Sequence, residues 1–103
     1  MTAWLVITAT IHDRARFLAD YGKPAAELVA RFGGAYVLRA PGAELLEGPG
    51  SSGESVVISR WPSREAALAF WTSSEYAALR TARQDIATCR ILLVDEGTKV
   101  PGQ

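Results

Sequence analysis

The sequence predicts an α+β fold of the ferredoxin-like type, in which a four-stranded antiparallel sheet carries helices on one face. The first observation is the element order β-α-β-β-α-β, read from hydrophobic periodicity. The second is a weak likeness between the two halves, because Val6-Ile7-Thr8 and Val57-Ile58-Ser59 each precede a capped helix by a similar distance. The third is length: 103 residues, 49% of them apolar, suit a single domain over residues 1–97 with a C-terminal tail at 98–103.

The first strand is expected at residues 4–11, which are rich in β-branched and aromatic side chains. One face of this strand is wholly apolar and the other is half polar; the two faces are Leu5/Ile7/Ala9/Ile11 and Trp4/Val6/Thr8/Thr10. Asp13 follows and suits a helix N-cap, since its carboxylate can accept from the free amides of a first turn.

The first helical segment is expected to run from Asp13 to Phe32, because its apolar residues recur at helical spacing. Gly22-Lys23-Pro24 interrupts this pattern, and proline has no amide to donate, so we expect a kink or two consecutive helices there. Gly33-Gly34 ends the segment in the left-handed conformation that helix C-termini favour.

Two further strands are expected at residues 35–40 and 55–61, with a turn at Pro41-Gly42 after the first of them. Residues 43–47 allow a short strand paired nearby. The composition of residues 48–53, which are glycine, serine and proline, predicts a flexible loop.

The last third of the chain contains a second helical segment and a final strand. Pro62 stops the preceding strand and Ser63 suits an N-cap. A run of weak helix formers then divides the segment, and a second helical piece is expected to begin near Glu75. The final strand is expected at residues 90–95.

The sheet face left bare by the helices carries more apolar side chains than a water-exposed face usually does. Trp4 and Val6 lie on it, together with either Leu92/Val94 or Ile91/Leu93. A second copy of the chain covering this face would make a homodimer. The alternative is a monomer with scattered exposed apolar residues, which are common on protein surfaces.

Several short motifs occur together at a distinctive spacing, and they are Phe32-Gly33-Gly34, Leu38-Arg39, Leu46-Glu47-Gly48, Trp61-Pro62-Ser63-Arg64-Glu65-Ala66-Ala67, Phe70-Trp71, Ser74-Glu75-Tyr76 and Arg83. With these motifs the chain resembles, over about residues 4–97, the DUF1330 family of bacterial proteins within the dimeric α+β barrel superfamily. The resemblance implies the fold described above and a homodimer joined through the open sheet faces. It implies little about activity, because the family has no established reaction. Arg60 is a departure, since family members often have an acidic residue there.

Composition excludes several classes of function. Eleven basic and eleven acidic residues give a formal charge of zero, so no pull toward nucleic acid or an anionic membrane is expected. One cysteine and one histidine exclude an internal disulfide and a zinc site built from several such ligands in one chain. We expect a cytoplasmic protein with no membrane span, no metal and no tightly bound cofactor.

His12 and Cys89 are the two side chains that could take part in proton transfer or nucleophilic chemistry. His12 stands at a strand-to-helix junction beside Asp13, which could orient its ring, and it is the reserve candidate for a catalytic base. Cys89 lies between Thr88 and Arg90, just before the last predicted strand. For both residues the alternative is a structural role, as a solvated histidine and a packed thiol.

A ligand site, if present, is expected between the helices and the sheet, where arginine forks can bind carboxylate or enolate oxygens and aromatic rings give flat walls. Its predicted lining residues are Arg39, Trp61, Tyr76 and Arg83. Structural salt bridges are the alternative, since Glu47, Glu54 and Asp85 could neutralise the arginines, and the aromatic residues could be core.

Two functions remain open. The first is binding or transformation of a small aromatic or polyketide-like molecule without a tightly bound cofactor, by analogy with cofactor-free monooxygenases and isomerases of the superfamily. The second is a non-catalytic homodimeric module for binding or assembly. An enclosed, polar-rimmed cavity of about 300 Å³ or more under the helices favours the first, and a solidly packed interior favours the second.

Overall fold

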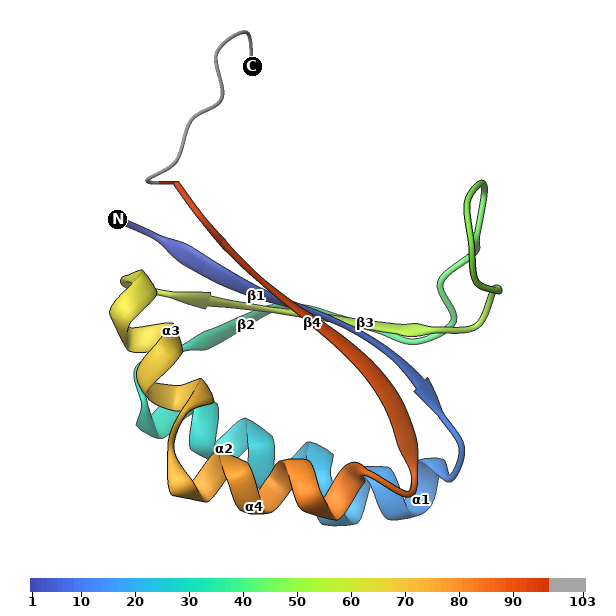
Figure 1. Cartoon of the computed structure of the whole chain (residues 1–103), viewed down its shortest axis with the longest axis horizontal. Helices are drawn as coiled ribbons and strands as arrows, with labels where there is room; N and C mark the ends of the chain where they lie inside the picture. The colour runs from blue at the N-terminus through green and yellow to red at the C-terminus, as the bar shows by residue number, and fades with distance from the viewer. Residues whose placement is uncertain (97–103) are drawn as a thin grey trace, which may run out of the picture.

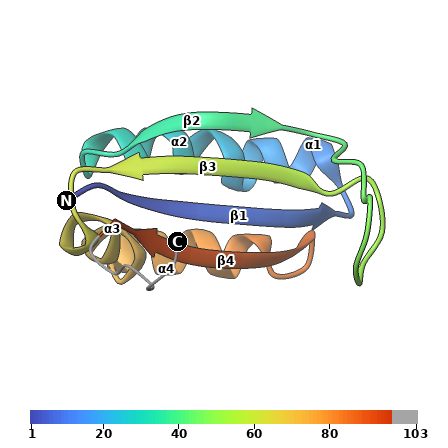
Figure 2. The ribbon, with the colours of Figure 1, turned by 90° about the horizontal axis from the view of Figure 1, so that it is seen from above.

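A computed structural model describes residues 1–96, and its strands form one antiparallel sheet in the order β2-β3-β1-β4 (Figure 2). The strands are β1 (Ala3–Ile11), β2 (Ala35–Ala40), β3 (Ser55–Trp61) and β4 (Ala87–Asp95). The predicted ferredoxin-like α+β fold is confirmed, and β2 and β3 have the predicted bounds. The predicted tail at 98–103 lies outside the described residues.

The helices all cover the same face of the sheet (Figure 1). They are α1 (Arg14–Phe17), η1 (Leu18–Gly22), α2 (Lys23–Arg31), α3 (Arg64–Trp71) and α4 (Ser74–Arg83). Seen from above, α1 and α2 lie behind β2 and β3, whereas α3 and α4 lie behind β1 and β4 (Figure 2). None of the helices in residues 1–96 has both the length and the apolar character needed to cross a membrane.

The predicted helix caps are confirmed. The Asp13 carboxylate accepts a hydrogen bond from the Arg16 amide at 3.1 Å, and the Ser63 hydroxyl accepts one from the Ala66 amide at 3.1 Å. Each side chain satisfies a donor that the first turn of a helix leaves without a partner.

The interruption before Pro24 is two α-helices joined by a single π-helical turn, η1. The Lys23 amide donates to the Leu18 carbonyl five residues earlier. Pro24 then occupies the first turn of α2, a position that proline favours because its fixed φ already suits a helix. The chain therefore stays helical through the proline by widening the turn before it.

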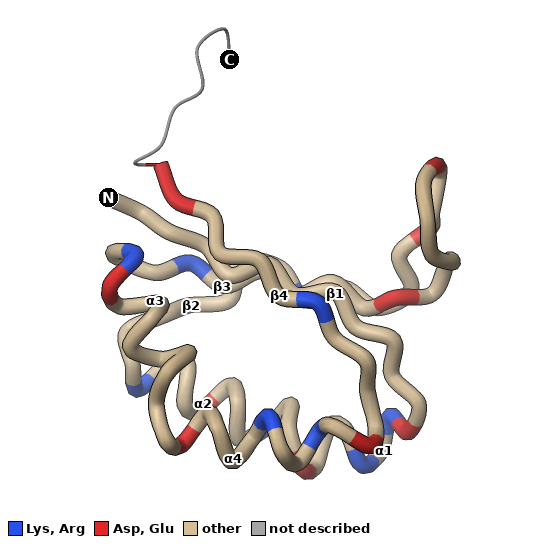
Figure 3. The backbone as a smooth tube through the Cα atoms, viewed as in Figure 1, with Lys and Arg blue, Asp and Glu red and all other residues tan. Residues whose placement is uncertain are grey.

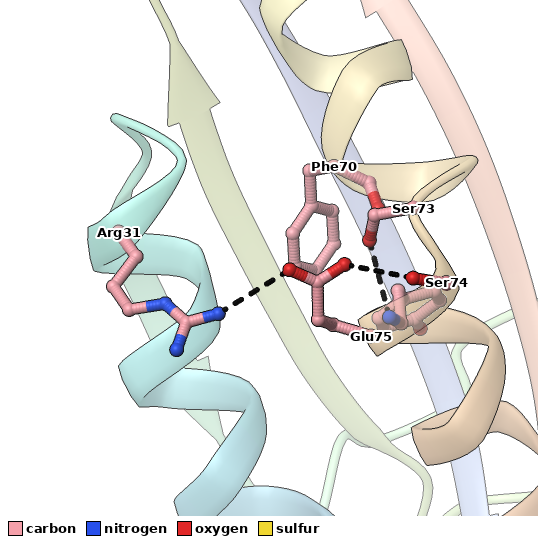
Figure 4. A network of polar contacts seen from close by, with 6 residues as sticks. Arg31, Phe70, Ser73, Ser74 and Glu75 are labelled. Atoms are coloured by element: carbon pink, nitrogen blue, oxygen red, sulfur yellow. Dashed lines mark hydrogen bonds and ion pairs between the residues drawn. The ribbon is translucent and has the colours of Figure 1, made fainter.

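The junction of α3 and α4 is fixed by polar contacts that also tie α4 to α2 (Figure 4). The Ser73 hydroxyl donates to the Phe70 carbonyl at 2.7 Å and accepts from the Tyr76 amide at 3.1 Å. Glu75, in the first turn of α4, pairs with Arg31 near the end of α2 at 3.6 Å. This exposed ion pair links α2 to α4 at the surface of the helical layer.

The core is densely packed at the end of the sheet where β3 finishes. The Trp61 ring lies 4.9 Å from that of Phe70, which lies 4.6 Å from that of Tyr76. Trp61 and Tyr76 are each 1% exposed. The Trp61 ring lies so close to Gly34 that a Cβ there would be 2.7 Å from it.

The opposite face of the sheet carries apolar side chains in register. Val6 is paired with Ile58 on one side and with Leu92 on the other. The alternation of β4 places Leu92 and Val94 on this open face, where they are exposed, and turns Ile91 and Leu93 toward the core. Of the two pairs that the sequence left open, Leu92/Val94 is therefore the one on the bare face of the sheet. Charged residues gather on helices and connections, and β1 carries none (Figure 3).

Three details of the sequence prediction are wrong. Strand β4 begins at Ala87 rather than Arg90, because its first residues pair with the end of β1. Residues 43–47 form no strand; Ala43 only exchanges backbone hydrogen bonds with Gly53 and Glu54 at 2.8 Å. Gly34 is not left-handed, whereas Gly33 has φ +91° as predicted.

Candidate functional site

A cavity of about 730 Å³ lies between the helical layer and the sheet, at the end opposite the packed core. Its walls come from the first half of the helical layer and from strands β1, β2 and β3, with one residue from β4. The lining residues are Ile7, Ala9, Ile11, Arg14, Ala15, Phe17, Leu18, Ala19, Tyr21, Gly22, Lys23, Ala26, Glu27, Tyr36, Arg39, Ala40, Pro41, Ser55, Val57 and Cys89. The cavity volume exceeds the roughly 300 Å³ expected of a small-molecule site, and the cavity is open to solvent rather than enclosed.

Strand register builds the floor of this cavity. Arg39, Val57 and Ile7 lie in one row across β2, β3 and β1. The next row on the same face holds Ser55 and Ala9, with Cys89 beyond. Small side chains at Ser55 and Ala9 leave space where the other end of the sheet has Trp61.

The π-helical turn forms the opposite wall. Leu18, Tyr21 and Gly22 belong to η1 and all line the cavity. A π turn is wider than an α turn and occurs often at functional sites. η1 packs on α4 and, at this end of the molecule, lines the cavity together with the strands.

The lining carries three cationic side chains and one carboxylate, which are Arg14, Lys23, Arg39 and Glu27. Arg14 Nη2 donates to the Ser55 hydroxyl at 3.4 Å. The Arg39 guanidinium lies 4.7 Å above the centre of the Tyr36 ring. Neither arginine, nor Lys23, forms an ion pair with any residue that the structure describes.

Behind the wall, Tyr21, Tyr76 and Arg83 form a buried polar group. The two hydroxyl oxygens are 2.7 Å apart, and the Arg83 Cζ lies 5.4 Å from the centre of the Tyr21 ring. Burial and the neighbouring Tyr76 raise the pKa of Tyr21 far above its ordinary value. Burial alone would lower the pKa of Arg83, but its interactions with Tyr76, Cys89 and Tyr21 together outweigh burial and raise the pKa overall. Arg83 is 9% exposed, and its buried Nε has no hydrogen-bond partner within residues 1–96.

Cys89 lines the cavity from within β4, whereas the sequence placed it just before that strand. Burial raises the pKa of its thiol, and Arg83 offsets part of this rise. The thiol is therefore held in its neutral form at neutral pH, which makes it a weak nucleophile.

His12 does not line the cavity. Its exposed ring lies at the end of β1, with Nε2 3.2 Å from the Thr88 hydroxyl. Asp13 does not orient the ring, because its carboxylate caps α1. These contacts are those of a solvated histidine at a helix entrance.

Of the four predicted lining residues, one lines the cavity and the other three lie in the packed interior next to it. Arg39 lines the cavity. Arg83 and Tyr76 share the continuous helix α4 and meet Tyr21 from behind, so they reach the cavity only through that ring. Trp61 belongs to the packed end, where its indole Nε1 donates to the Ser59 hydroxyl at 2.9 Å.

The predicted neutralising carboxylates do not pair with these arginines. Within residues 1–96 the ion pairs are Arg16–Asp20, Arg31–Glu75 and Arg64–Asp95. Arg39 and Arg83 instead face tyrosine rings, and Arg60 is exposed on the open face.

Sequence reasoning missed Arg14, Lys23, Glu27 and Tyr36. Tyr36 gave no signal, because it is three residues from Arg39 and strict alternation would place the two side chains on opposite faces of the strand. The register shift between Tyr36 and Leu38 brings both to the helical side. The two cations and Glu27 gave no signal either, since helical periodicity treats charged residues as the solvent face. Their role depends on the helix standing away from the sheet.

Chemically, the cavity combines apolar walls with side chains that donate hydrogen bonds. Arginine, lysine, serine and tyrosine side chains can hold anionic or carbonyl oxygens. Glu27 is the one carboxylate among its lining residues and can accept a proton there. No three His, Cys, Asp or Glu side chains within residues 1–96 gather as metal ligands.

Comparison with solved structures supports this fold. The RPA0582 protein of unknown function from Rhodopseudomonas palustris is 19% identical, with a TM-score of 0.73 over 95% of this chain and 84% of that chain. SnoaB, a cofactor-independent oxygenase from Streptomyces nogalater, is 20% identical, with a TM-score of 0.67 over 97% of each chain. At these identities the likeness shows the fold alone.

No curated protein matches the sequence. The family model described as "Domain of unknown function (DUF1330)" matches residues 2–97, nearly the whole chain. The resemblance seen in the sequence motifs is thereby confirmed: the chain belongs to the DUF1330 family.

Proposed function

We propose that this protein binds a small, largely apolar molecule in the cavity under its helices, and transforms it without a tightly bound cofactor. The observation that carries the proposal is the cavity itself. Its volume of about 730 Å³ lies within the usual range for small-molecule sites, roughly 300–1,000 Å³. Apolar walls with a few polar groups are the usual composition of such sites.

The similarity of the fold to that of SnoaB supports cofactor-free oxygenation as the class of reaction. SnoaB is a cofactor-independent oxygenase, so this arrangement of sheet and helices can house oxygenation without a cofactor. In this chain Glu27 is the group placed to take a proton from a bound molecule, and the cavity cations are placed to hold the resulting charge. The small molecule would be aromatic or polyketide-like, because the aromatic side chains of Phe17, Tyr21 and Tyr36 are among the lining residues.

We also propose that the protein is a cytoplasmic homodimer joined through the open sheet face. The apolar residues that support this proposal are Trp4, Val6, Leu38, Ile58, Leu92 and Val94. This assembly leaves the cavity free, because the helices lie on the other face. Binding and dimerisation are thus compatible, and the purely structural alternative leaves the cavity unexplained.

The test is native mass spectrometry of the protein purified from its own cells, compared with two variants. Ala26→Trp places an indole in the cavity from α2, whereas Ala30→Trp adds the same group at an exposed position one turn later. We expect a small organic molecule to accompany the unmodified protein and Ala30→Trp, but not Ala26→Trp. Equal retention by Ala26→Trp would refute the cavity as the site.

A further inference from the structure

The charge lining the cavity differs from that of the molecule as a whole. The chain has eleven basic and eleven acidic residues. The cavity, however, has Arg14, Lys23 and Arg39 against the single carboxylate of Glu27. These three cations come from α1, α2 and β2, so they surround the space rather than cluster on one element.

None of the three cations is neutralised by the protein. Arg14 contacts a hydroxyl, and Arg39 contacts a ring. Elsewhere in residues 1–96 three other arginines do form ion pairs with carboxylates. Arg60, Arg80 and Arg90 likewise form no ion pair within residues 1–96, but they do not line the cavity. Arg14, Lys23 and Arg39 do line it, so together they are available to an anion that enters this space.

Arg83 adds a fourth positive charge, which lies behind Tyr21 in the wall of the cavity. It is 9% exposed and lies 5.4 Å from the centre of the Tyr21 ring, which lines the cavity. Its polar neighbours include the Tyr76 hydroxyl and the Cys89 thiol, and it forms no ion pair with a carboxylate within residues 1–96. A buried charge without a counter-ion makes the surrounding space favourable for an anion, because a low-dielectric interior screens it weakly.

We infer that the ligand of this cavity is an organic anion: a flat apolar body carrying a carboxylate, phenolate or enolate oxygen. This inference rests on the proposed function and names its substrate class. The apolar body packs between the sheet and the π turn, against side chains such as Val57, Ile7 and Phe17. The anionic oxygen accepts hydrogen bonds from Arg39 or Arg14, whose planar guanidinium groups can each donate two.

Two dyes with one ring system separate charge recognition from apolar binding. Anilinonaphthalene sulfonate is anionic, and N-phenylnaphthylamine is the same compound without the sulfonate. Dyes can also bind the open sheet face. Binding in the cavity is therefore measured as the fluorescence signal that Ala26→Trp abolishes and Ala30→Trp keeps. In fluorescence titrations we expect the anion to bind about tenfold more tightly than the neutral dye at this site, which corresponds to one charged hydrogen bond.

Matched arginine variants then show which side chains cause the preference for the anionic dye. Arg39→Gln and Arg14→Gln each remove a cavity charge and should each reduce the preference for the anion about threefold to tenfold, with neutral-dye affinity unchanged. Arg16→Gln removes the same charge from an exposed neighbour of Arg14 that does not line the cavity, and it should keep the preference.

The outcomes distinguish the two proposals. If the neutral dye binds as tightly as the anion, or if both cavity variants keep the full preference, the anionic ligand is refuted while cavity binding stands. If neither dye responds to Ala26→Trp, the cavity does not bind small molecules and both proposals fall.

Discussion

Gly33 and Gly34 are neighbours that the fold requires for different physical reasons. Gly33 has φ +91° with open space around it, so it is required for backbone conformation. Gly34 has no such φ, but any Cβ there would lie 2.7 Å from the Trp61 ring. From sequence both looked like left-handed helix ends, because the close approach exists only after β3 has packed beneath the chain.

Gly34→Ala should destabilise the protein by about 1–3 kcal/mol, since the buried Trp61 ring must move to admit a methyl group. Gly33→Ala should cost about 1 kcal/mol, from backbone strain alone. Urea denaturation with an unchanged slope measures both. Near-ultraviolet circular dichroism separates them, because only Gly34→Ala should alter the tryptophan signal. An unfolding midpoint for Gly34→Ala equal to that of the unmodified protein would contradict this account.

Tyr21, Tyr36 and Cys89 all have raised pKa values, with burial as the main cause. In each case the folded state holds a proton that the unfolded chain releases at lower pH. Stability is therefore complete below the unfolded pKa values, 9.0 for the thiol and 10.0 for the tyrosines, and is lost as pH rises toward the folded ones.

The free energy of unfolding should thus fall between about pH 9 and 11, with Tyr21 contributing up to about 1.4 kcal/mol per pH unit above its unfolded pKa. Urea denaturation across this range measures the slope. Tyr21→Phe should make the slope shallower, even if it lowers stability at pH 7. A slope that Tyr21→Phe leaves unchanged would show that Tyr21 does not carry the effect.

At the scale of elements, the sequence predicted what local chemistry determines. The caps at Asp13 and Ser63 and the bounds of β3 follow from side chains adjacent in the chain. The start of β4 and the π turn do not. Strand β4 extends to Ala87 because β1 offers backbone hydrogen-bond partners there. A π turn differs from a kinked α-helix in which carbonyl accepts each amide hydrogen bond, and the residue pattern does not specify that acceptor.

Gly22 illustrates the same limit and gives a prediction. Its place in Gly22-Lys23-Pro24 suggested a helix breaker, yet its φ is −59°, and a Cβ would meet Leu18 Cδ2 at 3.5 Å, an ordinary contact. Gly22→Ala should therefore stabilise the protein by about 0.5–1 kcal/mol, because alanine loses less backbone entropy on folding. Thermal unfolding measures the gain. A lower melting temperature would mean that the π turn needs glycine.

At the scale of the whole molecule, the place of the site was predictable but most of its lining was not. Arg39 lies on the helix-covered face of β2 and lines the cavity. Trp61, Tyr76 and Arg83 also face inward, yet sequence cannot tell the packed end of the layer from the hollow one. That division depends on how the helices pack over the sheet, which no single residue determines.

The open sheet face determines the proposed assembly. Leu38, Leu92 and Val94 are 43%, 44% and 46% exposed there, and Val6 and Ile58 lie between them in the register. A contiguous apolar surface of this kind usually marks an interface. The connection of residues 41–54 rises on the same side (Figure 1), so it would flank a second copy docked on the sheet.

Sedimentation at micromolar concentration should therefore report about twice 11.1 kDa. Leu92→Glu should shift the protein toward monomer, because a carboxylate at the centre of the interface would be desolvated without a partner. Leu18→Glu is the matched control: this leucine is also exposed but lies on the helical layer, so the variant should stay dimeric. A monomer for the unmodified chain would refute the dimer, and dissociation by Leu18→Glu rather than Leu92→Glu would move the interface to the helices.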